Sequence, residues 1–447
     1  MPDPVAAEPL LIRDSPASPP RRPRVFLFAY ACSPDHGSEP GVGWNRAVEA
    51  ARSCDTWVVC EESRYGPPIR QYLDARGPIA GLTFVFVPKV VWPQPLRWLP
   101  GLAHLGYHLW QRRAYRVASK LHAKVGFDLV HQVTFCGYRE PSYSWKFGVP
   151  FVWGPVGGTQ NYPWRFLGIA GPKGAVREVV RSVLNRFQLR FSFQVRRAAR
   201  SAAVILAANT TVQRDLARVL RVSPRLQLET GIRAVNTVPR PPSEGPLRIL
   251  WSGELQCWKA LPLLLHALAA LPADVRYELR VLGQGPLEGR WRRLARKLGV
   301  DRQTTWIGWL PFQDALRQYE WADVLAFTSL RDTSGNVVLE ALAEGLPVIC
   351  LDHQGVRDIV TPECGIKVPV TRPREVIAGL AAAIDRLARD PDLKVHLGRG
   401  ALARAHDLLW SVQGERMAAI YIEVLAERRV NHLTAGQLND CGACLSK

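Results

Sequence analysis

The chain has 447 residues, of which 47% are hydrophobic and 22% are charged. This balance is typical of a globular protein and excludes a disordered or fibrous one. At roughly 100–200 residues per domain, the length predicts two or three domains, each with its own core. The formal net charge is +19, and it lies unevenly: residues 1–246 carry a net +17 (33 Lys and Arg, 16 Asp and Glu), and residues 247–447 only +2 (25 and 23). The N-terminal half is therefore expected to face an anionic partner, such as nucleic acid, a membrane or a phosphorylated substrate.

Residues 1–23 are expected to be a flexible leader, because they are rich in Pro, Ala and Ser and lack the apolar segment of a signal peptide. No apolar run approaches the roughly 20 residues that a membrane span needs. The sequence thus predicts a cytoplasmic protein, either soluble or peripheral on the cytoplasmic face of the inner membrane. Its nine scattered cysteines favour reduced thiols. Cys441 and Cys444 form a CxxC pair in the predicted flexible tail, 430–447, without the further ligands that a zinc site requires.

The first half of the chain alternates short apolar runs with helical segments. Arg24–Ala31 predicts a buried strand, which is followed by a glycine-rich turn, Gly37–Gly43, and a helix from Trp44 to Ala51. Further strands are predicted at 56–60, 83–88, 128–131, 150–153 and 203–207. This alternation favours a parallel sheet covered by helices, and therefore a Rossmann-like domain over residues 24–235.

A proline-rich linker, residues 236–246, is predicted to precede a second Rossmann-like domain over 247–408. Its strands are predicted at 248–251, 277–282, 305–307, 324–327 and 347–350, and its helices at 261–271, 287–298, 312–321, 337–344 and 374–388. A last helix, 409–429, is expected to close back toward the N-terminal domain. Two such domains imply an α/β protein with a cleft between them, where ligands bind at the carboxyl ends of the strands.

The most distinctive motif lies between Asp332 and Pro347 (DTSGNVVLEALAEGLP). A strand leads through a polar turn into a helix, whose first backbone N–H groups can bind an anion such as phosphate. Gly335 allows a ligand to approach the backbone, and Asn336 is a candidate helix cap. Asp332 and Glu340 can both face the cleft. The alternative is that Asp332 caps the helix and that Glu340 is a solvated residue on its surface.

Three further features are candidates for the same cleft. Lys259 follows Gly253 at the end of a predicted strand, where an ammonium group can neutralise a phosphate. The Gly37–Gly43 turn can wrap closely around a phosphate or a sugar. His131 ends a predicted strand of the first domain. The alternatives are a surface lysine, an ordinary glycine turn and a structural histidine.

Taken together, these motifs resemble those of the retaining glycosyltransferase family 4, which has the GT-B fold. The resemblance covers about residues 24–427 and includes GSEPGVGW, His131, Gly253 with Lys259, VLGQGP at 281–286 and IGWLP at 307–311. The stretch VVLEALAEGLPVI is similar to the second half of the family's E-x7-E signature. This is the most specific part of the resemblance.

The resemblance implies a role for each matching residue. Lys259 and the helix start would hold the donor diphosphate, and Glu340 would hydrogen-bond the donor ribose. Asp332 and His131 are the catalytic candidates, because they would face the donor sugar from the two domains. The implied donor-binding positions are Gly41, Gly43, Gly253, Lys259, Gly335, Asn336, Val337, Val338 and Glu340.

The implied activity is transfer of a sugar from a nucleotide-sugar donor to a lipid-linked or saccharide acceptor, in cell-surface polysaccharide or glycolipid synthesis. No cofactor and no metal are expected. The one DxD motif, Asp390-Pro-Asp392, lies between two predicted helices, where turn and capping chemistry explain it better than a metal site does.

The chain departs from the family pattern at three positions. Asp332 stands where the family has Glu, Glu254 stands where it has Arg, and Ala260 replaces the glycine that usually follows the lysine. An acid beside a diphosphate is unfavourable, so a degenerate, non-catalytic GT-B protein is one alternative. A basic nucleic-acid-binding protein is another, although the sequence contains no recognisable nucleic-acid motif and no nucleic-acid partner is expected.

The basic N-terminal half also predicts an anionic membrane surface as a partner. Residues 173–200 hold eight cations and one acid, Glu178, with Val, Leu and Phe between them at the spacing of an amphipathic helix. Residues 90–115 add basic residues beside aromatic ones: Trp92, Trp98, Tyr107 and Trp110. Basic residues with interfacial aromatics are typical of membrane-surface segments. A solvated basic face with ordinary core aromatics is the alternative.

Overall fold

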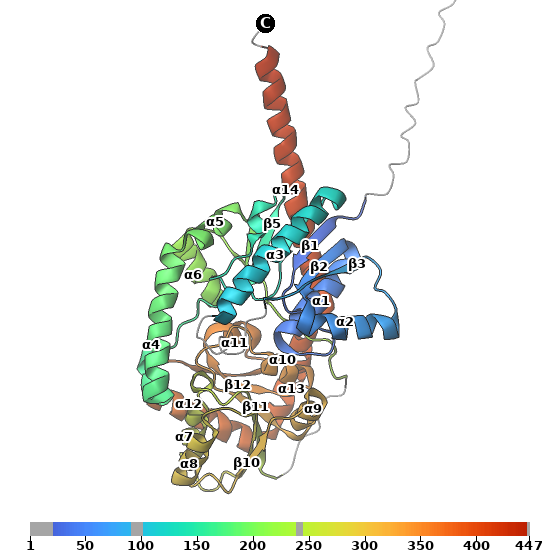
Figure 1. The fold of residues 1–447 in the computed structure, drawn as a ribbon. Coiled ribbons are helices and arrows are strands. Elements are labelled where there is room, and N and C mark those ends of the chain that lie inside the picture. The colour runs from blue at the N-terminus through green and yellow to red at the C-terminus, as the bar shows by residue number, and fades with distance from the viewer. Residues whose placement is uncertain (1–20, 91–101, 238–244, 445–447) are drawn as a thin grey trace, which may run out of the picture.

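The computed structural model describes residues 21–90, 102–237 and 245–444 of the chain. They form two α/β domains, one above the other in Figure 1, and each domain is built on a parallel sheet. This confirms the predicted pair of Rossmann-like domains. Among the helices described, none has the length and apolar character that crossing a bilayer requires.

The first domain contains a seven-stranded parallel sheet in the order β3-β2-β1-β4-β5-β6-β7. Its strands are β1 (Arg24–Phe28), β2 (Asp55–Glu61), β3 (Leu82–Val87), β4 (Leu129–Gln132), β5 (Phe151–Val156), β6 (Val204–Ala207) and β7 (Arg225–Leu226). The helices are α1 (Ser38–Ser53), α2 (Glu62–Arg76), α3 (Leu102–Val125), α4 (Leu167–Phe191), α5 (Phe193–Ser201) and α6 (Thr210–Leu220). The central strands are buried along their length, as apolar strands covered on both faces must be.

The second domain contains a six-stranded parallel sheet in the order β10-β9-β8-β11-β12-β13. Its strands are β8 (Leu247–Ser252), β9 (Tyr277–Leu282), β10 (Thr304–Gly308), β11 (Val324–Phe327), β12 (Val348–Asp352) and β13 (Gly365–Pro369). Its helices are α7 (Leu261–Ala269), α8 (Glu288–Leu298), α9 (Phe312–Trp321), α10 (Asn336–Ala343), α11 (Gln354–Ile359), α12 (Pro373–Arg389) and α13 (Pro391–His406). Three 3-10 turns complete the description: η2 (Tyr143–Lys146), η3 (Trp164–Phe166) and η4 (Cys257–Lys259).

The predicted glycine-rich turn after β1 is wrong. Helix α1 begins at Ser38 and therefore contains Gly41 and Gly43. Glu39 and Pro40 occupy its first turn, where an acid suits the helix dipole and proline costs no hydrogen bond. Glycine is needed here for close packing, because a Cβ on Gly43 would lie 2.1 Å from the carbonyl oxygen of Ala31.

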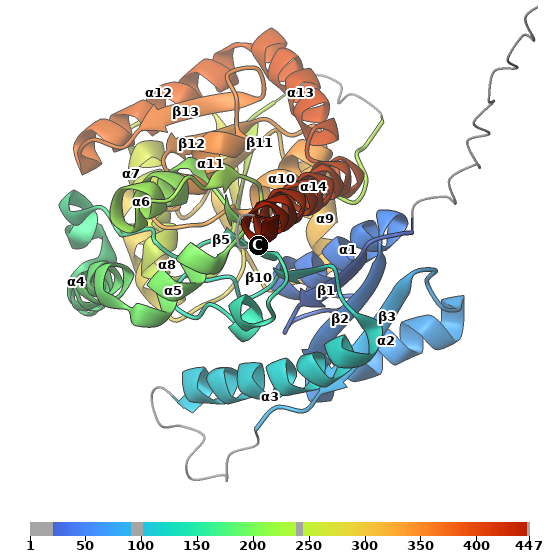
Figure 2. The ribbon, with the colours of Figure 1, turned by 90° about the horizontal axis from the view of Figure 1, so that it is seen from above.

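The last helix, α14 (Trp410–Cys444), packs on α1 and returns the chain to the first domain, as predicted (Figure 2). Trp410, Met417, Tyr421 and Val424 are buried in the core of that domain. The helix extends past residue 429, where the sequence was expected to become a flexible tail. The side chains of Cys441 and Cys444 lie outside the described residues.

The two domains are joined by more than the linker. The backbone of Ile232 bonds with both Leu408 and Trp410, so the two crossing segments lie side by side. Tyr162, Phe166 and Ala170, which precede and begin α4, are buried in the core of the second domain. Helix α4 then runs along one side of the molecule from the second domain to the first (Figure 1). These contacts fix the cleft between the domains.

Candidate functional site

A cavity of about 260 Å³ lies between the two domains. The first domain contributes the start of α1 and the second contributes α9 and α10, with the crossing segment between them. Residues that line it include Asp35, Gly41, Thr230, Arg233, Asn336 and Glu340. The cavity thus contains two predicted donor-site residues of α10 and one of the two α1 glycines.

Glu340 is held inside this cavity by a chain of hydrogen bonds. The hydroxyl of Tyr319 donates to Oε2 of Glu340 at 2.6 Å, and Tyr319 is itself hydrogen-bonded to the side chain of Ser252 at the end of β8. Burial raises the pKa of the Glu340 carboxyl, and the Tyr319 hydroxyl opposes this shift by favouring the ionised form. Glu340 is therefore a positioned carboxyl facing a cavity, and the alternative of a solvated surface residue is wrong.

Asp332 and Lys259 meet at the carboxyl ends of β8 and β11. The ammonium group of Lys259 forms an ion pair with Oδ2 of Asp332, and both side chains are about one-fifth exposed. The Asp332 carboxylate also accepts from the backbone N–H of Thr333, at 3.0 Å. Asp332 is not the cap of α10, because Gly335 occupies that position. An ammonium group has three donors, so the ion pair leaves Lys259 donors for a ligand.

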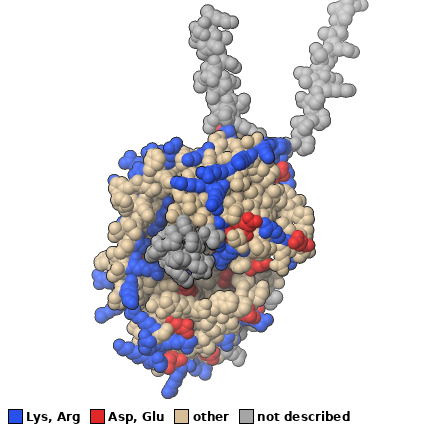
Figure 3. Space-filling view, viewed as in Figure 1, with Lys and Arg blue, Asp and Glu red and all other residues tan. Residues whose placement is uncertain are grey.

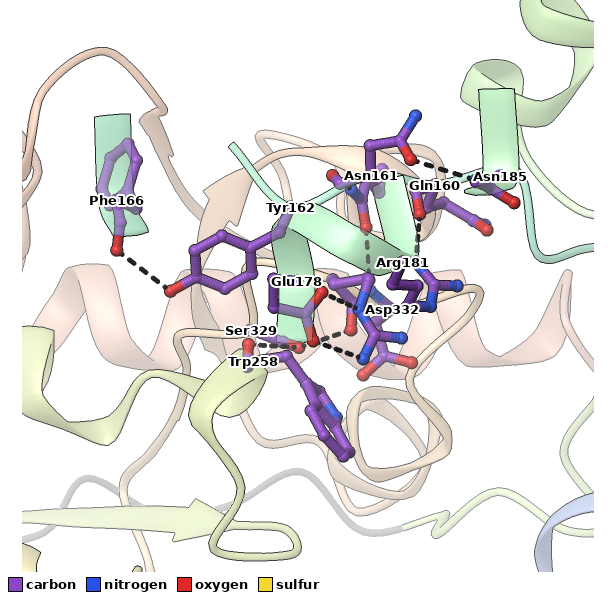
Figure 4. A network of polar contacts seen from close by, with 12 residues as sticks. Gln160, Asn161, Tyr162, Phe166, Glu178, Arg181, Asn185, Trp258, Ser329 and Asp332 are labelled. Atoms are coloured by element: carbon purple, nitrogen blue, oxygen red, sulfur yellow. Dashed lines mark hydrogen bonds and ion pairs between the residues drawn. The ribbon is translucent and has the colours of Figure 1, made fainter. Parts of the chain in front are cut away.

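Arg331, next to Asp332, ties this turn to the first domain. Its guanidinium forms a two-pronged ion pair with Glu178 of α4, with N···O distances of 3.0 Å, and Glu178 is 0% exposed. The guanidinium also lies 4.7 Å from the centre of the Trp258 ring. Figure 4 shows the surrounding network, in which Glu178 and Arg181 of α4 lie beside Asp332 and Trp258 of the second domain.

A second bridge holds the same turn from its other side. The side-chain amide of Gln354 accepts from the backbone N–H of Asp332 at 2.8 Å and donates to the carbonyl oxygen of Asn161 at 3.0 Å. Asn209 donates to the carbonyl oxygen of Thr333 at 2.8 Å. The backbone around Asp332 is therefore fixed by side chains from both domains.

A row of carboxyl groups follows the cleft away from Lys259. Glu229, in the segment that crosses between the domains, accepts from the hydroxyl of Ser334 at 2.8 Å. Burial and the nearby carboxylates of Glu39 and Asp332 raise the pKa of Glu229 to about 8. Burial also raises the pKa of Glu39, which accepts from the backbone N–H of Phe135 at 2.5 Å.

A second cavity, of about 690 Å³, opens at the carboxyl ends of β8, β9 and β10. Gly253, Glu254, Gly283 and Gly285 line it, together with Trp309, whose ring is 65% exposed. Glu254 accepts from the side-chain amide of Gln256 at 2.9 Å. The acid that replaces the family's arginine is thus exposed at the edge of this cavity.

The start of α10 offers fewer anion-binding groups than the sequence predicted. Gly335 is in the left-handed region, with φ of +79°, and a Cβ at this position would lie 3.0 Å from the ring of Phe327. Asn336 is the first helical residue and lines the interdomain cavity, but it does not cap the helix. The N–H of Val338 donates to the carbonyl oxygen of Gly335, and its side chain is fully buried. Val337 packs against the same core.

The two glycines of α1, Gly41 and Gly43, lie in different environments. Gly41 lines the interdomain cavity. Gly43 is buried, and a Cβ on it would lie 2.1 Å from the carbonyl oxygen of Ala31. The predicted place of Gly43 in the cleft stays a prediction.

His131 lies outside the cleft, so the prediction that it contacts a sugar is wrong. The side chain is 0% exposed, and its Nδ1 and Nε2 bond with the hydroxyl of Tyr421 and the carbonyl oxygen of Gly154 at 2.6 and 2.5 Å. Burial lowers the pKa of His131 to about 3. Tyr421 belongs to α14, so His131 anchors the closing helix as a neutral structural residue.

The described residues include no cluster of three or more His, Cys, Asp or Glu that could hold a metal ion. Asp390 caps α13 by accepting from the backbone N–H of Leu393 at 2.8 Å, which confirms the capping interpretation of the DxD motif. The seven cysteines whose side chains are described are buried and unpaired.

Comparison with known proteins identifies the domain that carries Lys259, Asp332 and Glu340. Residues 236–404 match the model of the family described as glycosyl transferases group 1. The match spans most of the second domain and includes Lys259, Asp332 and Glu340.

Curated relatives match about two-fifths to one-half of the chain. The D-inositol 3-phosphate glycosyltransferase of Saccharomonospora viridis is 31% identical over 247 residues, which cover 50% of this chain and 56% of that protein. The glycogen synthase of Mycobacterium tuberculosis is 30% identical over 189 residues, or 41% and 44% of the two chains. The chain thus spans about half the length of the curated relatives that it matches.

Solved structures resemble the whole fold and show it to be GT-B. A sucrose-phosphate synthase from Thermosynechococcus elongatus superposes with a TM-score of 0.61 at 18% identity, covering 91% of this chain and all of that one. The lipopolysaccharide outer core galactosyltransferase WaaB has a TM-score of 0.60 at 16% identity, covering 89% and 99%. Anabaena Alr3699/HepE in complex with UDP and glucose has a TM-score of 0.56 at 15% identity, covering 90% and 99%.

The sequence carries no signal for several residues that organise the site. Tyr319, Arg331, Gln354 and Glu229 lie outside every motif described above, and their partners are 21 to 193 residues away in the chain. One clue to the Arg331 bridge was available, since Glu178 is the single acid among eight cations. A lone acid on a basic helix indicates a buried partner.

Proposed function

We propose that the protein is a retaining glycosyltransferase of family 4 that transfers a sugar from a nucleotide-sugar donor to a lipid-linked or saccharide acceptor. The observation that carries the proposal is the buried Glu340 carboxyl, held by Tyr319 in the interdomain cavity of a group 1 domain. A buried carboxylate with one protein donor can accept two further hydrogen bonds, and vicinal ribose hydroxyls would supply them.

The donor diphosphate is assigned to Lys259 and to the first turn of α10. Negative charge grows on the diphosphate as its bond to the sugar breaks, so a fixed cation stabilises the transition state more than the ground state. The Lys259–Asp332 pair places the carboxylate beside this cation. Asp332 would then face the anomeric carbon, where positive charge develops. No metal or cofactor is needed in this scheme.

The wide cavity at β8–β10 would take the donor base, with the exposed Trp309 ring as a stacking surface. A complex of the structurally similar HepE with UDP and glucose supports this choice of donor class. In a retaining transfer, the acceptor hydroxyl enters on the side of the leaving diphosphate. The new bond joins the acceptor oxygen to the anomeric carbon as the carbon–phosphate-oxygen bond breaks, and the hydroxyl proton leaves with the diphosphate.

A lipid-linked acceptor would be presented at the cytoplasmic face of a membrane, and cell-surface polysaccharide or glycolipid synthesis is the process that we propose. The basic first domain supports this placement, because an anionic surface attracts it.

A panel of nucleotide sugars, screened by thermal shift, tests the donor site. At least one donor should stabilise the native protein, and Lys259→Ala and Glu340→Ala should each weaken that donor's binding at least about tenfold. Lys297→Ala and Glu375→Ala, at exposed positions of the same domain, are the matched controls. Equal donor binding by all five proteins would overturn the site. Product formation from the best donor distinguishes an enzyme from a non-catalytic GT-B protein.

A further inference from the structure

Helix α4 presents a continuous row of large apolar side chains to solvent. We call this row, together with the first residue of α5, the α4 ridge. The exposed fraction of each side chain lies between 45% and 71%. The ridge consists of Val176, Val179, Val180, Val183, Leu184, Phe187, Phe191 and Phe193.

The spacing of the seven residues from Val176 to Phe191 places them on one face of α4, because neighbours along this face are three or four residues apart, the period of a helical stripe. Phe193 follows at the start of α5. Gly171 breaks the helix with a φ of +72°, so the straight part begins at Pro172 and is about 30 Å long. The rings of Phe187 and Phe191 lie 4.9 Å apart and form the broad end of the ridge.

The opposite face of α4 is fixed by buried polar contacts. Glu178 is held by Arg331 of the second domain. Asn185 donates to the carbonyl oxygen of Thr159 at 2.7 Å and accepts from the hydroxyl of Tyr138 at 2.5 Å. Rotating the helix to bury its apolar face would leave these groups without partners, at a high cost in free energy. The ridge is therefore a stable outer surface of the folded protein.

Basic residues flank the ridge, and no exposed acid interrupts them. The exposed cations of α4 and α5 are Lys173, Arg177, Arg186, Arg190, Arg197 and Arg200. Glu178, the single acid of these two helices, is 0% exposed. In Figure 3, blue Lys and Arg atoms alternate with tan atoms along the edge where Figure 1 places α4.

The combination of apolar and basic groups selects one kind of partner. Nucleic acid would match the cations but would not bury eight large apolar side chains. A second copy of the chain would cover the apolar row but would bring two sets of cations together, which is unfavourable. An anionic bilayer satisfies both features, because its acyl region accepts the apolar groups and its phosphates accept the cations.

We propose that the α4 ridge lies on the surface of an anionic bilayer, with its apolar side chains in the interface and the flanking arginines at the lipid phosphates. The inference deepens the proposed function, since its purpose rests on a lipid-linked acceptor, but binding to vesicles can be measured without donor or acceptor.

The ridge lies in the first of the two membrane segments that the sequence predicted, residues 173–200. The second, residues 90–115, includes aromatic residues that the structure buries. Trp110 is 1% exposed and donates to the carbonyl oxygen of Val87 at 2.9 Å, and Tyr107 packs in the same core. These two aromatics are core residues, so their predicted role at the membrane is wrong. Trp92 and Trp98 lie outside the described residues.

Co-sedimentation of the full chain with vesicles tests the proposal. Vesicles of phosphatidylcholine with phosphatidylglycerol should bind the protein, and pure phosphatidylcholine vesicles should bind it far more weakly. The apolar variant Val183→Ser/Phe187→Ser/Phe191→Ser should lose about 30-fold or more in affinity. The charge variant Arg186→Glu/Arg190→Glu should lose a comparable amount and should become insensitive to added salt.

Matched controls lie elsewhere on the surface. Ile422→Ser removes a side chain that is 64% exposed on α14, and Arg302→Glu/Arg399→Glu reverses two exposed charges of the second domain. Both controls should bind vesicles as the parent does, and all variants should keep the parent's thermal midpoint.

Three results would overturn the proposal. The first is equal binding to neutral and anionic vesicles, and the second is undiminished binding by both ridge variants. The third is a parent that sediments as a dimer and ignores vesicles while the apolar variant is monomeric, which would assign the ridge to a second copy. Donor binding is measured separately by thermal shift, so failure of the donor site and failure of the ridge are distinguishable.

Discussion

Tyr319→Phe is expected to destabilise the protein to an extent that depends on pH. Tyr319 is 1% exposed, and its hydroxyl donates to the buried Glu340 carboxyl at 2.6 Å. The substitution keeps the ring and removes only the hydroxyl, so the core stays packed while Glu340 loses its donor. A hydrogen bond to a charged group contributes about 1.5–3 kcal/mol to stability, and one between neutral groups about 1 kcal/mol.

The protonation state of Glu340 determines which of these two hydrogen-bond free energies applies. Burial raises the pKa of this carboxyl, so stability gained from its neutral form is present at low pH and is lost as pH rises through the folded-state value. The Tyr319 hydroxyl limits that loss, because it stabilises the carboxylate. Without it, the pKa of Glu340 rises further and the loss extends to higher pH. The cost of the substitution should therefore rise with pH, from about 1 kcal/mol where the Glu340 carboxyl is neutral to about 2–3 kcal/mol where it is ionised.

Thermal unfolding of both proteins at pH 5 and pH 8 measures this difference. For a domain of this size, about 2 kcal/mol corresponds to a shift of roughly 4–8 °C in the midpoint. Tyr277→Phe is the control, because burial alone raises the pKa of Tyr277 to about 12 and no charged partner contributes. The control midpoint should shift equally at both pH values. An equal shift for Tyr319→Phe at pH 5 and pH 8 would refute the proposed role of its hydroxyl.

Three further changes test neighbouring parts of the site. Glu254→Arg should strengthen nucleotide-sugar binding about tenfold in calorimetric titration, because it restores a cation near the diphosphate; an unchanged affinity would place this position too far away. Arg331→Met should cost about 3–5 kcal/mol in urea unfolding by leaving Glu178 buried and charged, and adding Glu178→Leu should recover most of it; equal costs for the single and double variants would contradict a direct pair. Glu229→Gln should flatten the pH dependence of stability between about 4.3 and 8. The pKa of Glu229 is raised to about 8 in the folded protein, so the folded protein loses stability as the pH rises across this range. An unaltered slope in unfolding from pH 5 to 8 would count against this.

The sheets could be predicted from the sequence because buried parallel strands are short apolar runs between turn signals. The predicted bounds of β9, β11 and α9 agree with the structure residue for residue. The start of α1 could not be predicted in this way. Its glycines suggest a turn, but they serve helix packing against the carbonyl oxygens of Ala31 and His36.

The site was predictable only where its residues fall in one motif. Lys259 and Asp332 follow strand ends, and Glu340 lies on the helix that comes next. The parallel topology therefore brings them to one edge of the sheet. The direction of the His131 side chain could not be predicted in this way, because a histidine at a strand end can face either the cleft or a covering helix. Only the placement of Tyr421 on α14, 290 residues away, decides that it is structural.

The two faces of α4 connect the proposed membrane surface with the proposed donor site. Outward, the helix presents Phe187 and Phe191; inward, it presents Glu178, whose partner Arg331 is adjacent to Asp332. Because this ion pair is bidentate and buried, the position of α4 and that of the Asp332 turn are fixed relative to each other. A bilayer that holds the ridge would therefore also fix the orientation of the cleft. Of the two cations beside Asp332, Arg331 is already paired with Glu178, so Lys259 is the one that we propose for the diphosphate. The acid at Glu254 is then the departure that most needs testing.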